Sequence, residues 1–92
     1  MKKNKISRIN RILEMPSEVV SHVPKMTILG FKKIMIENYK SILEYQDFFI
    51  RLSTSLGIIN INGINMKMEE MTQDDIIVEG EIDSIDFEKI ED

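Results

Sequence analysis

The sequence has no cysteine, a single histidine and no apolar run long enough to cross a membrane. The lack of cysteine excludes disulfides, thiolate metal sites and cysteine nucleophiles, and it fits a reducing compartment. A membrane-spanning helix needs about 20 consecutive apolar residues, and no segment approaches that length. The basic N-terminus is not followed by the apolar core of a secretory signal. We therefore expect a cytoplasmic protein.

The single histidine, His22, limits the catalytic and metal-binding sites that the chain can form. It lies beside valines and a proline, which is typical of a connector rather than of a base or a metal ligand. The sequence also lacks a glycine-rich phosphate loop, a nucleophile elbow and a histidine-based metal pair. Its many carboxylates fall on segments expected to be exposed, where burial cannot raise a carboxyl pKa to that of a general acid. The sequence thus predicts a non-enzymatic protein without a cofactor or a metal.

The residues that are abundant point to one small β-rich domain. The chain has 92 residues, of which 42% are hydrophobic and 30% are charged, and its apolar content favours isoleucine and methionine. Disordered chains have fewer apolar residues and a larger net charge per residue. Isoleucine favours strands because a β-branched side chain packs well on a pleated surface.

Charge is distributed very unevenly along the chain. Residues 1–40 hold nine Lys/Arg and three Asp/Glu, which gives a net charge of +6. Residues 41–92 hold three Lys/Arg and thirteen Asp/Glu, which gives a net charge of −10. A basic end of this kind favours contact with an anionic partner or surface. Alternatively, the two ends of the chain attract each other, within one molecule or between copies.

Residues 5–14 predict a short amphipathic helix, and a connector follows up to residue 24. Ile6, Ile9 and Leu13 form one apolar stripe, and basic residues flank it. Because ten residues are marginal as an isolated helix, the segment must dock on something. The candidates are its own domain, an anionic membrane surface or the groove of a partner. The remaining alternative is that the segment is disordered. The residues expected to make a membrane or partner contact are Lys2, Lys3, Lys5, Ile6, Arg8, Ile9, Arg11 and Leu13.

From residue 25 the apolar period changes from 3.6 to 2, which predicts an antiparallel β domain over residues 25–88 and an acidic tail over residues 89–92. Seven strands are expected: residues 26–30, 31–37, 41–45, 48–52, 56–61, 64–68 and 76–87. The connections are too short for the crossovers that parallel strands need. The expected fold is mainly β, with about seven antiparallel strands in a meander, a small roll or a barrel.

The strongest local signal is Asn62-Gly63, which predicts a two-residue type I′ turn between the fifth and sixth strands. Five apolar residues would then share one face: Ile59, Ile61, Ile64, Met66 and Met68. The opposite face would expose three polar residues that are candidates for contact with a partner: Asn60, Asn65 and Lys67.

The last strand shows a change of phase. Ile76, Val78 and Ile82 follow one period-2 pattern, and Ile85 and Phe87 follow the other. A β-bulge at Asp83-Ser84 would bring both groups to the buried face, and a tight turn making two short strands would do the same. The acidic connector before this strand lacks the ligand spacing of a calcium loop, so a solvated loop is expected.

Five segments together resemble the YabP/YqfC family of sporulation proteins, and most closely its YqfC branch. They are residues 15–19 (Met-Pro-Ser-Glu-Val), 23–30, 36–43, 59–63 (Ile-Asn-Ile-Asn-Gly) and 76–87. The resemblance covers residues 15–88 in order. One departure is Tyr39, where many relatives are expected to have histidine.

The resemblance implies a role in endospore formation in the mother cell, with a membrane protein of the YqfD type as the suspected partner. It carries no catalytic residues. The expected function is therefore binding, at the mother-cell face of a membrane and in contact with a partner or anionic lipid. The alternatives are a self-assembling, homo-oligomeric component of the spore envelope and a nucleic-acid-binding small β-barrel. The acidic C-terminal half argues against nucleic acid.

Overall fold

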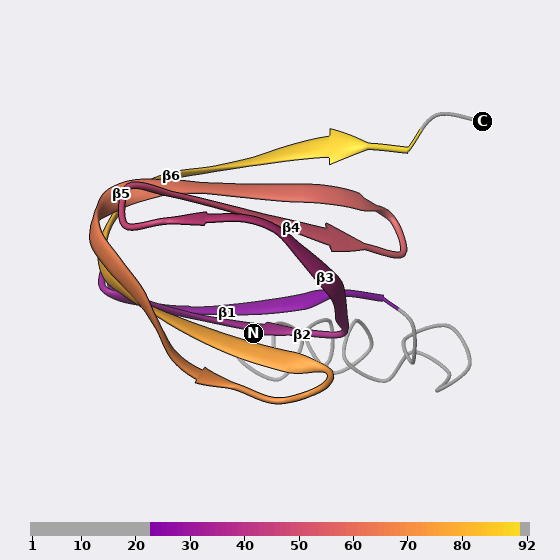
Figure 1. The fold of residues 1–92 in the computed structure, drawn as a ribbon, viewed down its shortest axis with the longest axis horizontal. Helices are drawn as coiled ribbons and strands as arrows, with labels where there is room; N and C mark the ends of the chain where they lie inside the picture. The colour runs from indigo at the N-terminus through magenta and orange to yellow at the C-terminus, as the bar shows by residue number, and fades with distance from the viewer. Residues whose placement is uncertain (1–22, 91–92) are drawn as a thin grey trace, which may run out of the picture.

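The computed structural model describes residues 23–90, which form a single sheet of six antiparallel strands (Figure 1). The strands are β1 (Lys25–Leu29), β2 (Lys33–Glu37), β3 (Tyr39–Gln46), β4 (Phe49–Thr54), β5 (Gly57–Met71) and β6 (Asp75–Lys89). Their order in the sheet is β1-β2-β6-β5-β4-β3. The all-β, antiparallel prediction is confirmed. The predicted N-terminal helix lies outside the described residues, and within them no helix is long and apolar enough to span a membrane.

The sheet is open, and it folds over on itself because its two longest strands bend. β5 and β6 run side by side along the upper layer and turn into the lower layer at the left of Figure 1. Asn38 alone separates β2 from β3, yet these strands lie in different halves of the sheet. Its φ of 65° lets the chain turn sharply there, as asparagine readily does. The Asn38 and Tyr39 N–H groups both donate to the Asp74 carbonyl, at 2.7 and 3.2 Å.

The predicted hairpin at Asn62-Gly63 is wrong. Both residues lie inside β5, and neither adopts the positive φ that a type I′ turn requires. The chain reverses instead after Met71, where the Thr72 N–H donates to the Asp75 carbonyl at 2.8 Å. The structure therefore has six strands in place of the expected seven, because two predicted strands are halves of β5.

The predicted bulge in the last strand is confirmed. Pairing passes from Asn62↔Ser84 to Gly63↔Ile82, so Asp83 of β6 has no partner residue on β5. This extra residue brings Ile85 back to the inner side, where it packs against the core. Phe87 was predicted to be buried with Ile85, but it is 61% exposed near the end of the strand.

A second bulge, on β5, turns Met66 toward the core. Pairing passes from Ile64↔Glu81 to Lys67↔Glu79, so two residues of β5 lie opposite Gly80 alone. Asn65 has a φ of 52° at this point. As a result Met66 is buried. Ile64, which was predicted to be in the core, precedes the bulge and is 50% exposed, because β5 alternates without a turn through Asn62-Gly63.

The core lies between the two halves of the folded sheet. Four strands supply its nine buried apolar residues: Ile34, Ile36, Ile50, Leu52, Ile59, Ile61, Met66, Ile76 and Val78. The pairs at i and i+2 in β2, β4 and β6 follow the period-2 pattern of the sequence. Met26 of β1 and Tyr39 of β3 pack against this core from the two edge strands.

Candidate binding surfaces

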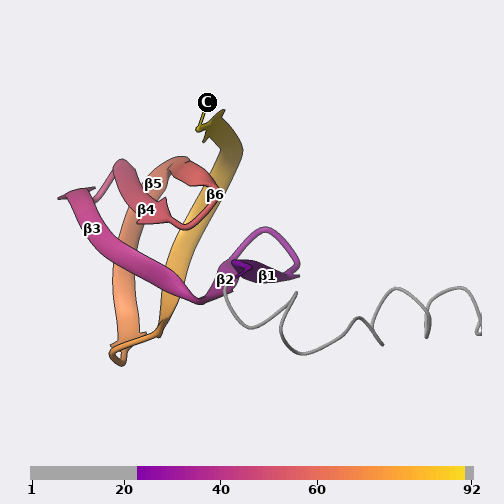
Figure 2. The ribbon, with the colours of Figure 1, turned by 90° about the vertical axis from the view of Figure 1, so that its right-hand side faces the viewer.

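An apolar groove lies at the end of the molecule opposite the bend. The strand ends that line it are at the side of the ribbon that faces the viewer in Figure 2. It has a volume of about 320 Å³, and we call it the end groove. Its lining comes from the start of β1, the β4–β5 turn and the end of β6: Pro24, Met26, Thr54, Leu56, Gly57, Ile58, Ile59, Phe87, Glu88 and Lys89. Leu56 and Phe87 are 57% and 61% exposed at its rim. The groove is therefore suited to apolar side chains.

One buried hydroxyl shapes the floor of the end groove. Thr54, at the end of β4, accepts hydrogen bonds from the N–H groups of Leu56 (3.1 Å) and Gly57 (3.2 Å). It also donates to the Gly57 carbonyl at 2.8 Å. A Cβ at Gly57 would lie 2.1 Å from the Glu88 carbonyl oxygen, so glycine lets β5 pass directly over β6. The turn is thus held in one conformation, and Leu56 projects at the rim.

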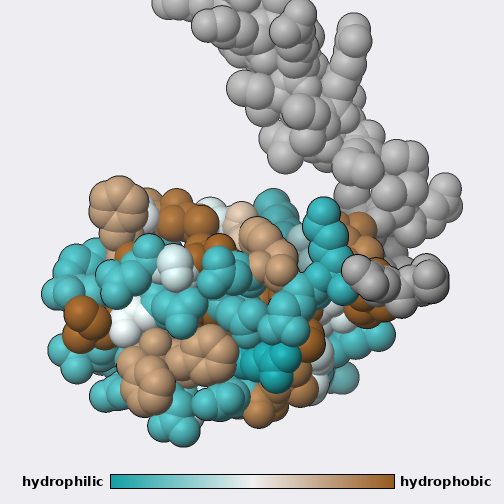
Figure 3. Space-filling view, turned by 90° about the horizontal axis from the view of Figure 1, so that it is seen from above, coloured by the Kyte–Doolittle hydropathy of each residue, from teal (hydrophilic) through white to brown (hydrophobic). Residues whose placement is uncertain are grey.

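A second apolar surface surrounds the bend, and we call it the bend patch. Its members are Leu29, Phe31, Phe48 and Ile64, all at least half exposed. Two turns carry the aromatic residues, and backbone hydrogen bonds fix both turns to the bent strands. The Ile82 N–H donates to the Phe31 carbonyl at 2.9 Å, and the Gly63 N–H donates to the Phe48 carbonyl at 3.1 Å. Figure 3 shows apolar side chains at the surface at this left-hand end.

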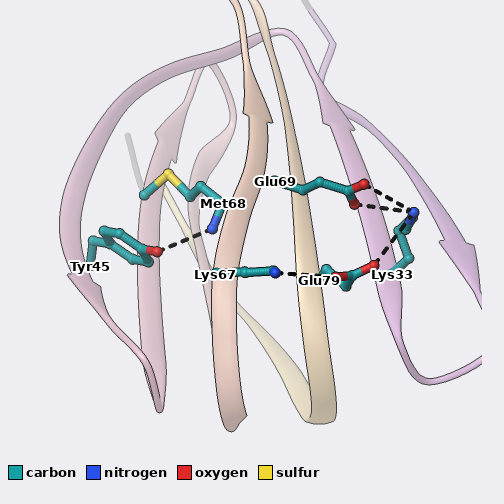
Figure 4. A network of polar contacts seen from close by, with 6 residues as sticks. All are labelled: Lys33, Tyr45, Lys67, Met68, Glu69 and Glu79. Atoms are coloured by element: carbon teal, nitrogen blue, oxygen red, sulfur yellow. Dashed lines mark hydrogen bonds and ion pairs between the residues drawn. The ribbon is translucent and has the colours of Figure 1, made fainter.

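The predicted exposed hairpin face exists only in part. Asn65 and Lys67 are exposed on β5, but Asn60 is half-buried. Lys67 lies at the edge of a charged row that runs across the sheet in Figure 4: its Nζ is 3.8 Å from Glu79, which is 3.7 Å from Lys33. Lys33 is also 3.1 Å from Glu69, and the hydrogen bond with Glu69 raises the pKa of Lys33.

Asn60 belongs to a different cluster, nearer the end groove. Its side-chain amide donates to Glu88 at 2.8 Å, and Arg51 donates to the same carboxylate at 3.0 Å. The Asn60 hydrogen bond, followed by that of Arg51, lowers the pKa of Glu88. The structure therefore does not bring Asn60, Asn65 and Lys67 together into one site.

The predicted basic contact residues lie outside the described residues: Lys2, Lys3, Lys5, Ile6, Arg8, Ile9, Arg11 and Leu13. Within residues 23–90, no group of three His, Cys, Asp or Glu side chains could hold a metal ion. The end groove was not predicted from the sequence, because Met26, Leu56 and Phe87 come from three distant segments. The phase of Phe87 on the last strand predicted a buried position, whereas Phe87 is 61% exposed at the groove rim.

Comparison with known proteins agrees with the resemblance found in the sequence. The YabP family matches residues 21–92. The protein YqfC of Bacillus subtilis (strain 168) is 30% identical over 79 residues, which cover 86% of this chain and 85% of that protein. No solved structure matches the chain significantly. On the family match and this similarity, the chain belongs to the YabP family.

Proposed function

We propose that this chain is a non-enzymatic sporulation protein that acts by binding at the mother-cell face of a membrane, with a membrane protein of the YqfD type as its partner. Membership of the YabP family suggests the sporulation-related role. The observation that carries the membrane part is the separation of charge between the sheet and the N-terminal segment. Residues 23–90 hold seven Lys/Arg and twelve Asp/Glu, whereas residues 1–22 hold five Lys/Arg and two Asp/Glu.

The sheet domain thus has a net charge of −5 and is repelled by an anionic bilayer, whereas residues 1–22 have a net charge of +3. Basic residues close to an anionic leaflet contribute about 1 kcal/mol each to binding. The apolar stripe of Ile6, Ile9 and Leu13 adds a surface that can enter the interface. Membrane contact is therefore assigned to the N-terminal segment, and the sheet stays in the aqueous phase.

The bend patch supports contact between the sheet and a protein partner. Phe31 is 82% exposed and Phe48 is 60% exposed, on two turns that flank the same bend. Aromatic residues are enriched in the cores of protein interfaces, because they bury a large area with little loss of side-chain entropy.

Co-sedimentation with anionic phosphatidylglycerol vesicles tests the membrane part. The test variant carries Lys2→Gln, Lys3→Gln, Lys5→Gln, Arg8→Gln and Arg11→Gln. The matched control removes the same charge from the sheet domain, with Lys25→Gln, Lys32→Gln, Lys40→Gln, Lys67→Gln and Lys89→Gln. We expect the wild-type chain and the control to sediment with the vesicles, and the test variant to stay in solution. Equal sedimentation of all three would overturn the assignment.

A specific observation also favours self-assembly as a second candidate function. The two edges of the sheet differ: β3 pairs with β4 through two register shifts, whereas β1 pairs with β2 without interruption. A regular edge strand presents unpaired backbone groups that a second copy can extend. Ile28 and Leu29 of β1 are largely exposed. Light scattering as a function of protein concentration tests this candidate, with Ile28→Lys as the blocking variant, and a strict monomer at high concentration would remove it.

A further inference from the structure

We propose that the end groove is the docking site for residues 5–14 of the same chain. The groove exposes apolar surface to water at Leu56 and Phe87, and the adjacent Met26 packs against the core beneath it. Exposed apolar surface that is concentrated in a groove marks a binding site. A group that covers it must therefore be apolar and must be able to reach this end of the molecule.

The N-terminal segment leaves the sheet at the groove itself. Pro24 lines the groove, and the carbonyl of Val23 accepts a hydrogen bond from the Asn38 side chain at 3.0 Å. This contact fixes the point from which the remaining 22 residues begin. Ten residues of extended chain span at most about 33–36 Å, so the connector from residue 14 to residue 24 allows the segment to return to the groove.

The segment has the apolar pattern and the charge that the groove requires. In the predicted helix, Ile6, Ile9 and Leu13 lie on one side and form a narrow apolar stripe. A stripe of this kind can be covered by a single groove. Its basic flanks belong to a region of net charge +3, and the sheet domain has a net charge of −5. Glu88 and Lys89 at the groove carry opposite charges, so the attraction comes from the domain as a whole rather than from one ion pair.

Docking regulates membrane contact, and this consequence rests on the function proposed above. The stripe of Ile6, Ile9 and Leu13 cannot be covered by the end groove and buried in lipid at the same time. A membrane surface must therefore compete with the groove, and opening the groove raises the affinity for vesicles. The docked segment holds membrane binding back until an anionic surface is available.

Hydrogen–deuterium exchange of the full chain in dilute solution without lipid tests the docking. The test variant carries Leu56→Asp and Phe87→Asp at the groove rim. Since both side chains are mostly exposed, the variant should keep the exchange protection of the core strands β4, β5 and β6. The matched control is Phe48→Asp, at an equally exposed position of the bend patch at the other end of the molecule.

We expect the amides of residues 5–14 to exchange at least ten times faster in the groove variant than in the wild-type chain and the Phe48→Asp control. The groove variant should also bind anionic vesicles at lower lipid concentration. Equal exchange rates in the three proteins would overturn the docking. Protection that grows with protein concentration would also overturn it, because a second copy would then fill the groove. If protection is lost as expected but no protein binds vesicles, the docking stands and the membrane proposal fails.

Discussion

Gly63 of β5 lies directly against the backbone of Glu81 in β6. A Cβ added at Gly63 would lie 2.2 Å from the Glu81 carbonyl oxygen and 2.8 Å from the sulfur of Met66. The contact occurs beside the bulge at Asp83, where both long strands bend. Glycine at this position therefore allows the two strands to cross closely, and the two halves of the sheet can enclose the core.

Gly63→Ala should lower the free energy of unfolding by about 1–3 kcal/mol, because the new methyl group displaces backbone as well as a side chain. Asn62→Ala is the matched control on the preceding residue, whose side chain is only half-buried. The control should lower the free energy of unfolding by less than about 0.5 kcal/mol. Urea denaturation of both variants measures the difference. Equal midpoints would show that the close approach at Gly63 does not constrain the sheet.

Ile61 and Ile64 provide a test of the register of β5. A hairpin at Asn62-Gly63 would place both side chains on the same buried face, whereas in the structure Ile61 is fully buried and Ile64 is half exposed. Ile61→Ala should therefore destabilise the domain by about 2–5 kcal/mol. Ile64→Ala should cost less than about 1 kcal/mol, since half of its apolar surface already contacts water. Similar losses for the two variants in thermal or urea unfolding would favour the hairpin.

The Thr54 hydroxyl should be required for the β4–β5 turn. Thr54→Val keeps the shape of the side chain but leaves two N–H groups without their acceptor in a buried turn. We expect a loss of about 1–3 kcal/mol in the free energy of unfolding. Thr27→Val, on the exposed side of β1, is the control for the loss of a hydroxyl. If the two variants unfold at the same urea concentration, the Thr54 hydrogen bonds contribute nothing to stability.

Glu88 should make the stability of the domain depend on acid pH. Hydrogen bonds from Asn60 and Arg51 lower the pKa of its carboxyl below the ordinary value of 4.5. The ionised form is therefore favoured by folding, and its contribution is present above pH 4.5 and is lost as the pH falls through the lowered pKa. Glu88→Gln should reduce the drop in urea midpoint between pH 7 and pH 3. Glu44→Gln on β3 is the control, and an equal reduction there would contradict the assignment to Glu88.

The sequence predicted the features that depend on neighbouring residues. The period-2 pattern from residue 25 predicted strands, and the structure buries Ile34 and Ile36 of β2, and Ile50 and Leu52 of β4, with this period. The change of phase between Ile82 and Ile85 predicted a bulge at Asp83-Ser84, and in the structure the extra residue is Asp83. These signals are local, because side chains of a strand alternate with a period of two whatever the strand pairs with.

The features that the sequence did not predict depend on distant partners. Asn62-Gly63 is a favourable turn sequence, but glycine is equally required where two backbones approach closely, and only the position of Glu81 decides between the two uses. The phase of β5 changes at Asn65 rather than at Asn62, so Ile64 was assigned to the wrong face. The end groove depends on three separate segments, and its shape cannot be obtained from any one of them.

Fractionation of sporulating cells tests the central claim most directly, namely that the N-terminal segment holds this protein at a membrane. The measurement is the fraction of the chain in the membrane pellet, together with the count of heat-resistant spores. Cells with the wild-type chain are compared with cells in which Ile6, Ile9 and Leu13 are replaced by serine. We predict that the wild-type chain is found with the membranes and that the variant is soluble and gives fewer spores. Equal membrane fractions and equal spore counts would contradict the account.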